Sequence, residues 1–259
     1  MTLLKSLLLR ALPEPLLFQV KRLHYPSVVR GFRSPHEAVL RALIDAGDRV
    51  LDIGANIGWY TYAFSSLVGP AGKVLSVEPV PPTFAHLSHC VRRLRLTNVE
   101  LFNCAMSEHP GGAVMEVPRY PAGGENFYMA RIVHDAPARA LRTFTVPVRS
   151  VDGLLDGEGR RVAFVKCDVE GHELAVFRGA RATIARWQPA LLVEVSDDPD
   201  AAGSSAHVLA RELAEVGYVP YRFDGRGLAQ RQRGDHAVDY FFLTSPHVAR
   251  LQRARLLVA

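Results

Sequence analysis

From residue 49 onward, short runs rich in β-branched residues alternate with longer runs of helical periodicity. This alternation constrains the fold most strongly, because strands that alternate with helices form βαβ units and a parallel sheet. Strands are expected at residues 49–53, 73–77, 99–103, 162–167 and 190–195. Helices are expected at residues 59–68, 81–95, 173–187 and 204–216. The largely apolar run at 162–167 predicts a central strand that is buried on both faces.

Two regions depart from this alternation. Residues 218–223 and 239–244 are predicted strands joined by a segment too short for a crossover helix, so an antiparallel hairpin is expected. Residues 109–141 are rich in Gly, Pro and Ala and are expected to leave the sheet as an irregular, substrate-side excursion, with short strands at 114–117 and 143–148. The predicted organisation is an N-terminal helical extension over residues 1–44 and one domain over residues 45–259.

The composition, with 48% hydrophobic and 22% charged residues, excludes a disordered or disulfide-stapled chain. Cys90, Cys104 and Cys167 are an odd number without CxxC spacing. Reduced, buried thiols in a cytoplasmic protein are therefore expected, and no metal site. A net charge of +5 favours anionic partners in general, but we interpret it as a solvated surface.

Residues 3–23 are amphipathic and basic. They cannot span a bilayer, because Lys5, Arg10 and two prolines interrupt the apolar run well short of the ~20 residues required. No small-residue cleavage site follows, which argues against a signal peptide. Such a segment either packs on the domain or lies on a membrane surface. The second alternative predicts peripheral contact with the inner face of the membrane.

The most specific motif is Asp-Ile-Gly-Ala-Asn-Ile-Gly-Trp-Tyr-Thr at residues 52–61, directly after the first predicted strand. Gly54 and Gly58 permit a tight turn and the close approach of a ligand. Asp52 ends the strand at the edge where open α/β sheets bind ligands. Glu78, twenty residues past Gly58, ends the next strand and can accept hydrogen bonds from both hydroxyls of a ribose. Together these residues predict a nucleoside cofactor.

The spacing of the turn indicates which cofactor is bound. Dinucleotide enzymes carry GxGxxG, whose middle glycine admits a pyrophosphate, whereas this chain has GxNxG with Asn56 in the middle. Asp52 would repel a pyrophosphate but suits the ammonium of a methionine moiety. The motif therefore favours S-adenosylmethionine, whose sulfonium is cationic, over NAD(P).

The turn and a later segment, Lys-Cys-Asp-Val-Glu-Gly-His-Glu at residues 166–173, resemble the FkbM-type family of S-adenosylmethionine-dependent methyltransferases. The likeness covers about residues 45–200. It implies a class I methyltransferase (Rossmann-like) fold, doubly wound, with a mostly parallel seven-stranded sheet. It also implies a set of cofactor contacts from the turn, the second strand and the end of the third: Asp52, Gly54, Asn56, Gly58, Tyr60, Thr61, Glu78, Ala105, Met106 and Ser107.

Methyl transfer to a hydroxyl is an in-line displacement in which a base takes the hydroxyl proton. Asp168, Glu170 and His172 follow the fourth predicted strand at the mouth of the same crevice. Asp168 is expected to position the cofactor or the acceptor, and Glu170 or His172 to act as the base. The alternative for Asp168 is an N-cap of the following helix. Glu194 is either a second acceptor-side carboxylate or an exposed acid.

Known members of the family mostly methylate hydroxyls of sugars, polyketides and lipids. The resemblance therefore implies an O-methyltransferase with a small-molecule, sugar or lipid-linked acceptor. Residues of the excursion are expected to line the acceptor pocket: Tyr120, Glu125, Asn126, Phe127, Tyr128 and His134. The alternatives are an RNA methyltransferase, an NAD(P)-dependent oxidoreductase and a non-catalytic binding module. A pI near 9.3 favours the first, but nucleic acid is not the expected partner, because a (D/N)PP(Y/F) box is missing.

Overall fold

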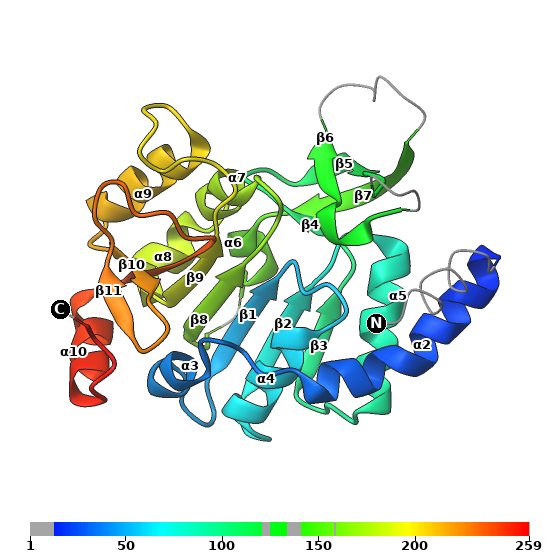
Figure 1. The fold of residues 1–259 in the computed structure, drawn as a ribbon, viewed down its shortest axis with the longest axis horizontal. Helices are drawn as coiled ribbons and strands as arrows, with labels where there is room; N and C mark the ends of the chain where they lie inside the picture. The colour runs from blue at the N-terminus through cyan, green and yellow to red at the C-terminus, as the bar shows by residue number, and fades with distance from the viewer. Residues whose placement is uncertain (1–12, 121–124, 134–140, 158, 259) are drawn as a thin grey trace.

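A computed structural model describes residues 13–120, 125–133, 141–157 and 159–258 (Figure 1). Its centre is an eight-stranded sheet with the order β11-β10-β12-β9-β8-β1-β2-β3. The parallel half consists of β3 (Val99–Phe102), β2 (Lys73–Val77), β1 (Arg49–Ile53), β8 (Val162–Cys167) and β9 (Ala190–Glu194). These strands match the predicted ranges to within one residue, which confirms the alternating pattern.

The other end of the sheet is antiparallel. β12 (Asp239–Leu243) pairs with β9 and with β10 (Val219–Phe223), so the predicted hairpin is confirmed. An eighth strand, β11 (Leu228–Gln230), is added at the edge beyond the seven expected. It forms because Leu228 is fully buried and its N–H donates to the carbonyl of Leu256 near the C-terminus, at 2.8 Å. A strand of three residues is too short to show a periodic pattern in the sequence.

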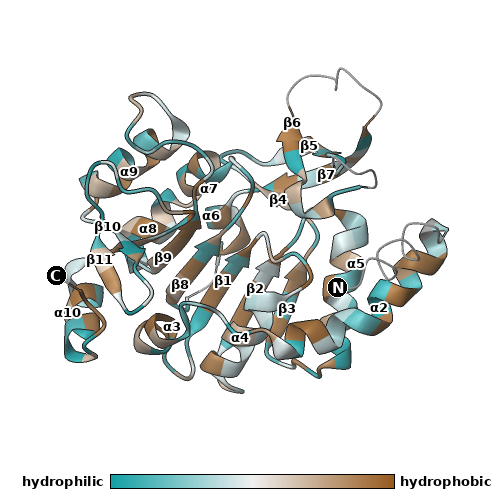
Figure 2. Cartoon of the chain, in the orientation of Figure 1, coloured by the Kyte–Doolittle hydropathy of each residue, from teal (hydrophilic) through white to brown (hydrophobic). Residues whose placement is uncertain are grey.

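Helices cover both faces of the sheet, as a doubly wound fold requires. One apolar cluster lies under α6 (Val151–Leu154), α7 (Glu173–Arg178), α8 (Arg181–Trp187) and α9 (Ser205–Glu215). The opposite cluster lies under α3 (Glu37–Leu43), α4 (Trp59–Val68) and α10 (Ser245–Arg253), while α5 (Pro81–Arg93) covers the β3 end. In Figure 2 the ribbon along β8 and β9 is coloured mainly as hydrophobic. The class I methyltransferase architecture is therefore confirmed.

The prediction of one helix over residues 173–187 is wrong. The structure has two helices, α7 and α8, separated at Gly179. A side chain at Gly179 would overlap the carbonyl of Ser107, and the Gly179 carbonyl accepts from the N–H of Asp152 at 2.9 Å. The Asp152 carboxylate then caps α8 by accepting from the N–H groups of Ala182 and Thr183. Tertiary contacts therefore break a run that is helical in its periodicity.

The excursion is more regular than predicted. Its described residues form β5 (Gly111–Val117), the short 3-10 helix η1 (Phe127–Met129) and β6 (Arg131–Val133). Together with β7 (Arg142–Arg149) and β4 (Ala105–Met106) they make a second sheet of order β4-β7-β5-β6. The strands predicted at 114–117 and 143–148 are thus confirmed within β5 and β7. The two glycines at residues 111 and 112 hide the start of β5 in the sequence, because glycine is depleted in strands.

The last helix, α10, is absent from the sequence-based prediction, although Thr244 before Ser-Pro is a helix-start signal.

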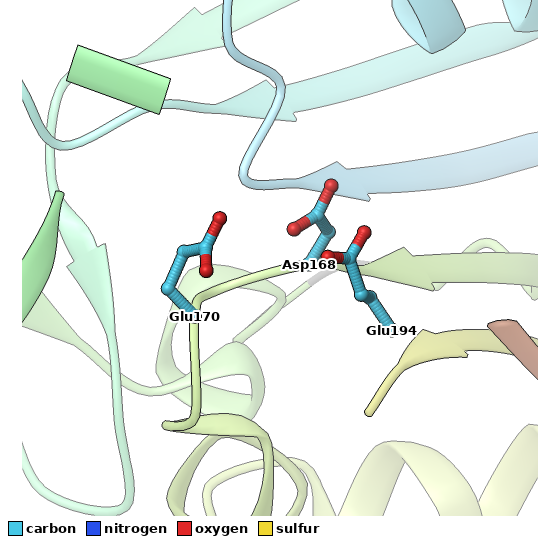
Figure 3. Close-up of side chains that lie close together, drawn as sticks. All are labelled: Asp168, Glu170 and Glu194. Carbon is cyan, nitrogen blue, oxygen red and sulfur yellow. The ribbon is translucent and has the colours of Figure 1, made fainter. Parts of the chain in front are cut away.

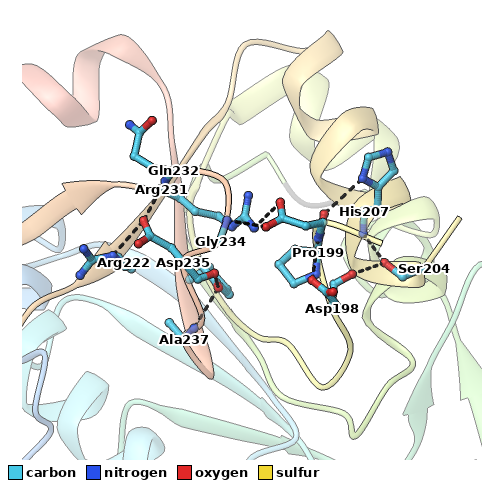
Figure 4. A network of polar contacts seen from close by, with 12 residues as sticks. Asp198, Pro199, Ser204, His207, Arg222, Arg231, Gln232, Gly234, Asp235 and Ala237 are labelled. Carbon is cyan, nitrogen blue, oxygen red and sulfur yellow. Dashed lines mark hydrogen bonds and ion pairs between the residues drawn. The ribbon is translucent and has the colours of Figure 1, made fainter. Parts of the chain in front are cut away.

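A polar network secures the segment between β11 and β12 to the loop before α9 (Figure 4). Arg231 pairs with Asp200 at 2.6 Å, and Arg222 pairs with Asp235 at 3.0 Å. These partly exposed charge pairs connect the loops at the antiparallel edge.

The described part of the N-terminal region includes α2 (Glu14–Gly31), which packs on α5 at the periphery of the molecule (Figure 1). Phe18 stacks on His86 with ring centroids 4.2 Å apart, and Arg22 Nε donates to His89 Nδ1 at 3.1 Å. Residues 3–12 of the predicted amphipathic segment lie outside the described residues. No described helix is both long and apolar enough to cross a membrane. The division at residues 44 and 45 stays a prediction.

Among the glycines that the structure describes, Gly54 leaves the least room for a side chain. Its φ is +77°, and a Cβ there would overlap the backbone carbonyl of Asp168. We predict that Gly54→Ala destabilises the protein well beyond the ~1–2 kcal/mol of left-handed strain, as measured by urea unfolding. The matched control is Gly217→Ala, where φ is +91° but a Cβ would meet nothing within 4 Å. Equal losses in the two variants would contradict the packing argument.

Candidate functional site

The C-terminal ends of β1, β2, β8 and β9 open into a cavity. This is the edge at which open α/β sheets bind ligands. From the main sheet, the lining includes Gly54, Asn56, Glu78, Asp168 and Glu194. From the second sheet and η1 it includes Met115, Phe127, Tyr128, Ala130 and Ile132. The excursion therefore forms one wall of the site.

Glu78 lies at the end of β2 with 6% of its surface exposed. Its Oε2 accepts from the N–H of Asn56 at 3.0 Å, and its Oε1 accepts from the N–H of Val80 at 2.9 Å. Each carboxylate oxygen keeps a further lone pair for a ligand hydroxyl. Burial raises the pKa of Glu78 to about 7, although the two backbone donors act in the opposite direction. Its charge is therefore sensitive to small changes near neutral pH.

Asn56 holds the middle of the glycine turn in a left-handed conformation, with φ of +52°. Its backbone N–H is engaged by Glu78. Its side-chain Oδ1 is buried and has no hydrogen-bond partner among the described residues. Because a buried acceptor without a donor is costly, this oxygen indicates a place for a ligand donor group.

Asp52 lies behind the cavity and not in its lining, contrary to its expected place at the crevice. Its side chain is fully buried, and Oδ2 accepts from Thr61 Oγ1 at 2.6 Å. Burial raises the pKa of Asp52, while the nearby Lys166 ammonium opposes that rise. The strand register explains the placement, because Asp52 pairs with Lys166 across β1 and β8. Asp52 therefore faces Thr61 and Lys166 and is not among the residues that line the cavity.

Lys166 is a functional candidate that the sequence analysis did not select. Its Nζ donates to Asp168 Oδ2 at 2.8 Å and lies 4.9 Å from the ring centroid of Tyr60. Burial alone would lower the pKa of Lys166, but Asp168 and Asp52 raise it, so the ammonium stays charged. A lysine within an otherwise apolar strand was the available signal, since buried lysines need a partner.

Three carboxylates meet at the cavity. Asp168, Glu170 and Glu194 each place an oxygen within 4.8 Å of the others (Figure 3). Burial, followed by the charge of Asp168, raises the pKa values of Glu170 and Glu194 to about 7. Asp168 is not the N-cap of α7, because that position is His172. The cluster can accept a proton near neutral pH, and its oxygens are chemically suited to a cation.

His172 also lines the cavity, and its Nε2 lies 2.9 Å from Ser107 Oγ. The predicted cofactor residues Ala105 and Met106 line the cavity, whereas Ser107 contacts it through His172. Gly58, Tyr60 and Thr61 lie in or just before the first turn of α4, outside the lining.

Aromatic residues, which we call the aromatic cover, form part of the cavity wall. Trp59, the first residue of α4, stacks on Tyr128 with centroids 5.9 Å apart and planes inclined by 10°. The Tyr128 hydroxyl is 3.2 Å from that of Tyr25 on α2. Among the other excursion candidates, Asn126 caps η1, Glu125 pairs with Arg142, Tyr120 is exposed, and His134 lies outside the described residues.

A family model described as the methyltransferase FkbM domain matches residues 52–220. The chain belongs to the FkbM methyltransferase family. S-adenosylmethionine is accordingly the cofactor of this FkbM methyltransferase, and the expectation from residues 52–61 and 166–173 is confirmed at the level of the family.

Named relatives share shorter stretches with this FkbM methyltransferase. A protein-L-isoaspartate O-methyltransferase of Methanococcus maripaludis is 33% identical over 58 residues, which cover 22% of this chain and 27% of that protein. Methyltransferase 1 of Beauveria bassiana is 28% identical over 144 residues, covering 50% and 57%. The chain thus matches less than two thirds of the length of either relative.

Solved structures resemble the chain at low identity. The FkbM methyltransferase of Methylobacillus flagellatus has a TM-score of 0.48 at 16% identity, covering 85% of this chain and 58% of that one. The fibrillarin of Aeropyrum pernix, in complex with S-adenosyl-L-methionine, has a TM-score of 0.45 at 16% identity, covering 80% and 73%. The assignment depends on the family match and not on these likenesses.

The cavity of this FkbM methyltransferase suits S-adenosylmethionine chemically. Glu78 offers carboxylate lone pairs to ribose hydroxyls, and the unpartnered Asn56 Oδ1 offers an acceptor to an ammonium. The apolar residues Val80, Cys104, Ala105 and Met106 line the region beside Glu78, where a flat purine could lie. The carboxylates of Asp168, Glu170 and Glu194, which also line the cavity, favour a cationic cofactor.

We predict that Glu78→Gln binds S-adenosylhomocysteine at least tenfold more weakly, because charge-assisted hydrogen bonds contribute ~1.5–3 kcal/mol. Since the carboxyl of Glu78 has a pKa of about 7, wild-type affinity should fall as the pH is lowered through 7, whereas the variant should lose the part of this fall that residue 78 contributes. Calorimetry from pH 6 to pH 8.5 measures both effects. Glu100→Gln, at an exposed ion pair with Lys73, is the control. A retained wild-type pH dependence in Glu78→Gln would contradict the assignment.

Proposed function

We propose that the protein is an O-methyltransferase that transfers a methyl group to a hydroxyl of a small-molecule, sugar or lipid-linked acceptor. The observation that carries this proposal is Glu170, a half-buried carboxylate that points into the cavity beside Asp168 (Figure 3). Its pKa of about 7 suits a general base at neutral pH. A hydroxyl needs such a base, because its proton must leave as the new C–O bond forms.

Each residue of the site then has a role under this proposal. Gly54, Asn56, Glu78, Ala105 and Met106 line the cofactor position, and S-adenosylmethionine supplies an activated methyl group on a sulfonium. Asp52, Gly58, Tyr60 and Thr61 hold the turn from behind, and Ser107 orients His172. Lys166 holds the Asp168 carboxylate in place through its hydrogen bond, so that Asp168 can position the cofactor or the acceptor. Glu170 takes the hydroxyl proton, with His172 as the second candidate.

The acidic mouth also bears on the acceptor. Asp168, Glu170 and Glu194 each place an oxygen within 4.8 Å of the other two, so a group bound between them would meet all three carboxylates. A phosphate at ~5 Å from a carboxylate is repelled by ~1–3 kcal/mol in a partly solvated site. This disfavours the nucleic-acid alternative despite the basic pI, and it favours a neutral hydroxyl acceptor. Domain boundaries at 44 and 45, with the acceptor-side insertion at 109–141, belong to the same proposal.

A lipid-linked acceptor would place the enzyme at a membrane surface. Residues 3–23 are the segment that we expect to make such a peripheral contact, because they combine leucines with basic residues.

We predict that Glu170→Gln and His172→Ala bind S-adenosylmethionine as the wild type does, and that at least one loses ~100-fold or more in kcat. The base must be ionised, so wild-type kcat at saturating cofactor should fall as the pH drops below the Glu170 pKa of about 7. Glu170→Gln should lose this fall if Glu170 is the base. Glu215→Gln, an exposed acid on α9, is the control.

The assay is a screen of neutral hydroxylated acceptors with labelled cofactor, followed by kinetics with the best one. Turnover within a few-fold of wild type in both Glu170→Gln and His172→Ala would overturn the assignment of the base. Transfer to RNA in preference to every neutral hydroxyl would overturn the acceptor class.

A further inference from the structure

The net positive charge of the chain is confined to its N-terminal end. Residues 1–36 contain six basic residues and one acidic residue, whereas residues 37–259 contain 25 of each. About one seventh of the chain therefore carries the whole charge of +5. The two signs of charge are therefore not distributed evenly along the chain. Such an asymmetry is typical of a segment that meets an anionic surface.

The same region exposes an aliphatic stripe. Leu16, Val20 and Leu23 of α2 are 49%, 38% and 81% exposed. Their spacing of four and three residues places them on one side of the helix. The opposite side packs on the protein through Phe18 and Tyr25. A helix with two apolar sides is unusual at a protein surface, because the outward side is normally polar.

The charges beside the stripe are all of one sign. From Pro15 to Gly31 the chain contains no acidic residue. Arg30, on the exposed side of α2, and Arg33, just beyond its end, are both exposed. Lys21 and Arg22 are half-buried, and Arg22 is bonded to His89 on α5. Aliphatic side chains between basic residues are the pattern by which a helix lies in the interface of an anionic bilayer.

We propose that the outward side of α2 docks on a bilayer that contains anionic phospholipid. Leu16, Val20 and Leu23 would insert among the acyl chains, and Arg30 and Arg33 would face the headgroups. Nucleic acid is the less suitable occupant, because its binding uses phosphate and base contacts and gives no role to three exposed aliphatic side chains. The docking itself does not depend on which acceptor is methylated.

The position of α2 connects this surface to the cavity. Tyr25, on the packed side of the helix, has its hydroxyl 3.2 Å from that of Tyr128, which lines the cavity. Docking would therefore bring the aromatic cover close to the bilayer. If the proposed O-methyl transfer holds, this arrangement suits an acceptor whose hydroxyl is presented from a membrane.

The test is sedimentation of the full chain with vesicles of phosphatidylcholine, with and without phosphatidylglycerol. Wild-type protein should bind the phosphatidylglycerol vesicles about tenfold or more tightly, and high salt should weaken that binding. The variant Leu16→Gln/Val20→Gln/Leu23→Gln should lose at least about tenfold. Arg30→Gln/Arg33→Gln should lose the preference for anionic lipid. A thermal shift with S-adenosylhomocysteine in every variant verifies folding and is independent of methyl transfer.

Matched controls use exposed residues far from α2. Val216→Gln/Val238→Gln removes exposed valines, and Arg211→Gln/Arg253→Gln removes exposed arginines on α9 and α10, at the other end of the sheet (Figure 1). Both should bind vesicles as the wild type does. The proposal would be overturned if the wild type failed to sediment with anionic vesicles, or if Leu16→Gln/Val20→Gln/Leu23→Gln bound them normally. A wild-type dimer that dissociates in the Leu16→Gln/Val20→Gln/Leu23→Gln variant would also overturn it. So would an RNA oligonucleotide that displaces the vesicles and whose binding needs Arg30 and Arg33 but not the three aliphatic residues.

Discussion

The parallel pairing of β1 with β8 is the contact on which the site depends. It brings Asp52 opposite Lys166 and allows the N–H of Asp168 to donate to the carbonyl of Ile53 at 3.1 Å. At this junction the chain passes so closely that a glycine is needed at residue 54. A buried ammonium between two carboxylates costs desolvation and is stable when all its partners are present. Removing one partner would leave an uncompensated charge beside the cofactor position.

The electrostatics of the molecule are divided between two places. The cavity collects carboxylates around Asp168. Burial, and after it the charge of Asp168, raises the pKa values of Glu170 and Glu194 to about 7. The excess positive charge lies in residues 1–36, at the N-terminal end of the chain. A basic protein thus presents an acidic reaction site. Overall pI and local chemistry therefore point to different partners, and the local groups govern what the site can accept.

The second sheet adds a wall to the crevice at the end of the main sheet. β5, η1 and β6 place Met115, Tyr128 and Ile132 against the edge of the main sheet. Tyr128 is in turn held by Trp59 from α4 and by Tyr25 from α2. Three elements far apart in the chain meet at this cover. Its geometry explains why the excursion bears on ligand binding although it lies outside the βαβ core.

The sequence by itself determined the parallel core, the glycine turn and the carboxylates at the strand ends, because strand periodicity and turn chemistry are local properties. Glu78, Asp168 and Glu170 could be selected from their positions after strands. Only the tertiary structure decided that Asp52 faces Lys166 and not the cavity, since strand register sets which side chains meet. It also decided the break at Gly179, the strand β11 and the pairing of β5 with β7. Those features depend on contacts between residues distant in sequence, which no local pattern records.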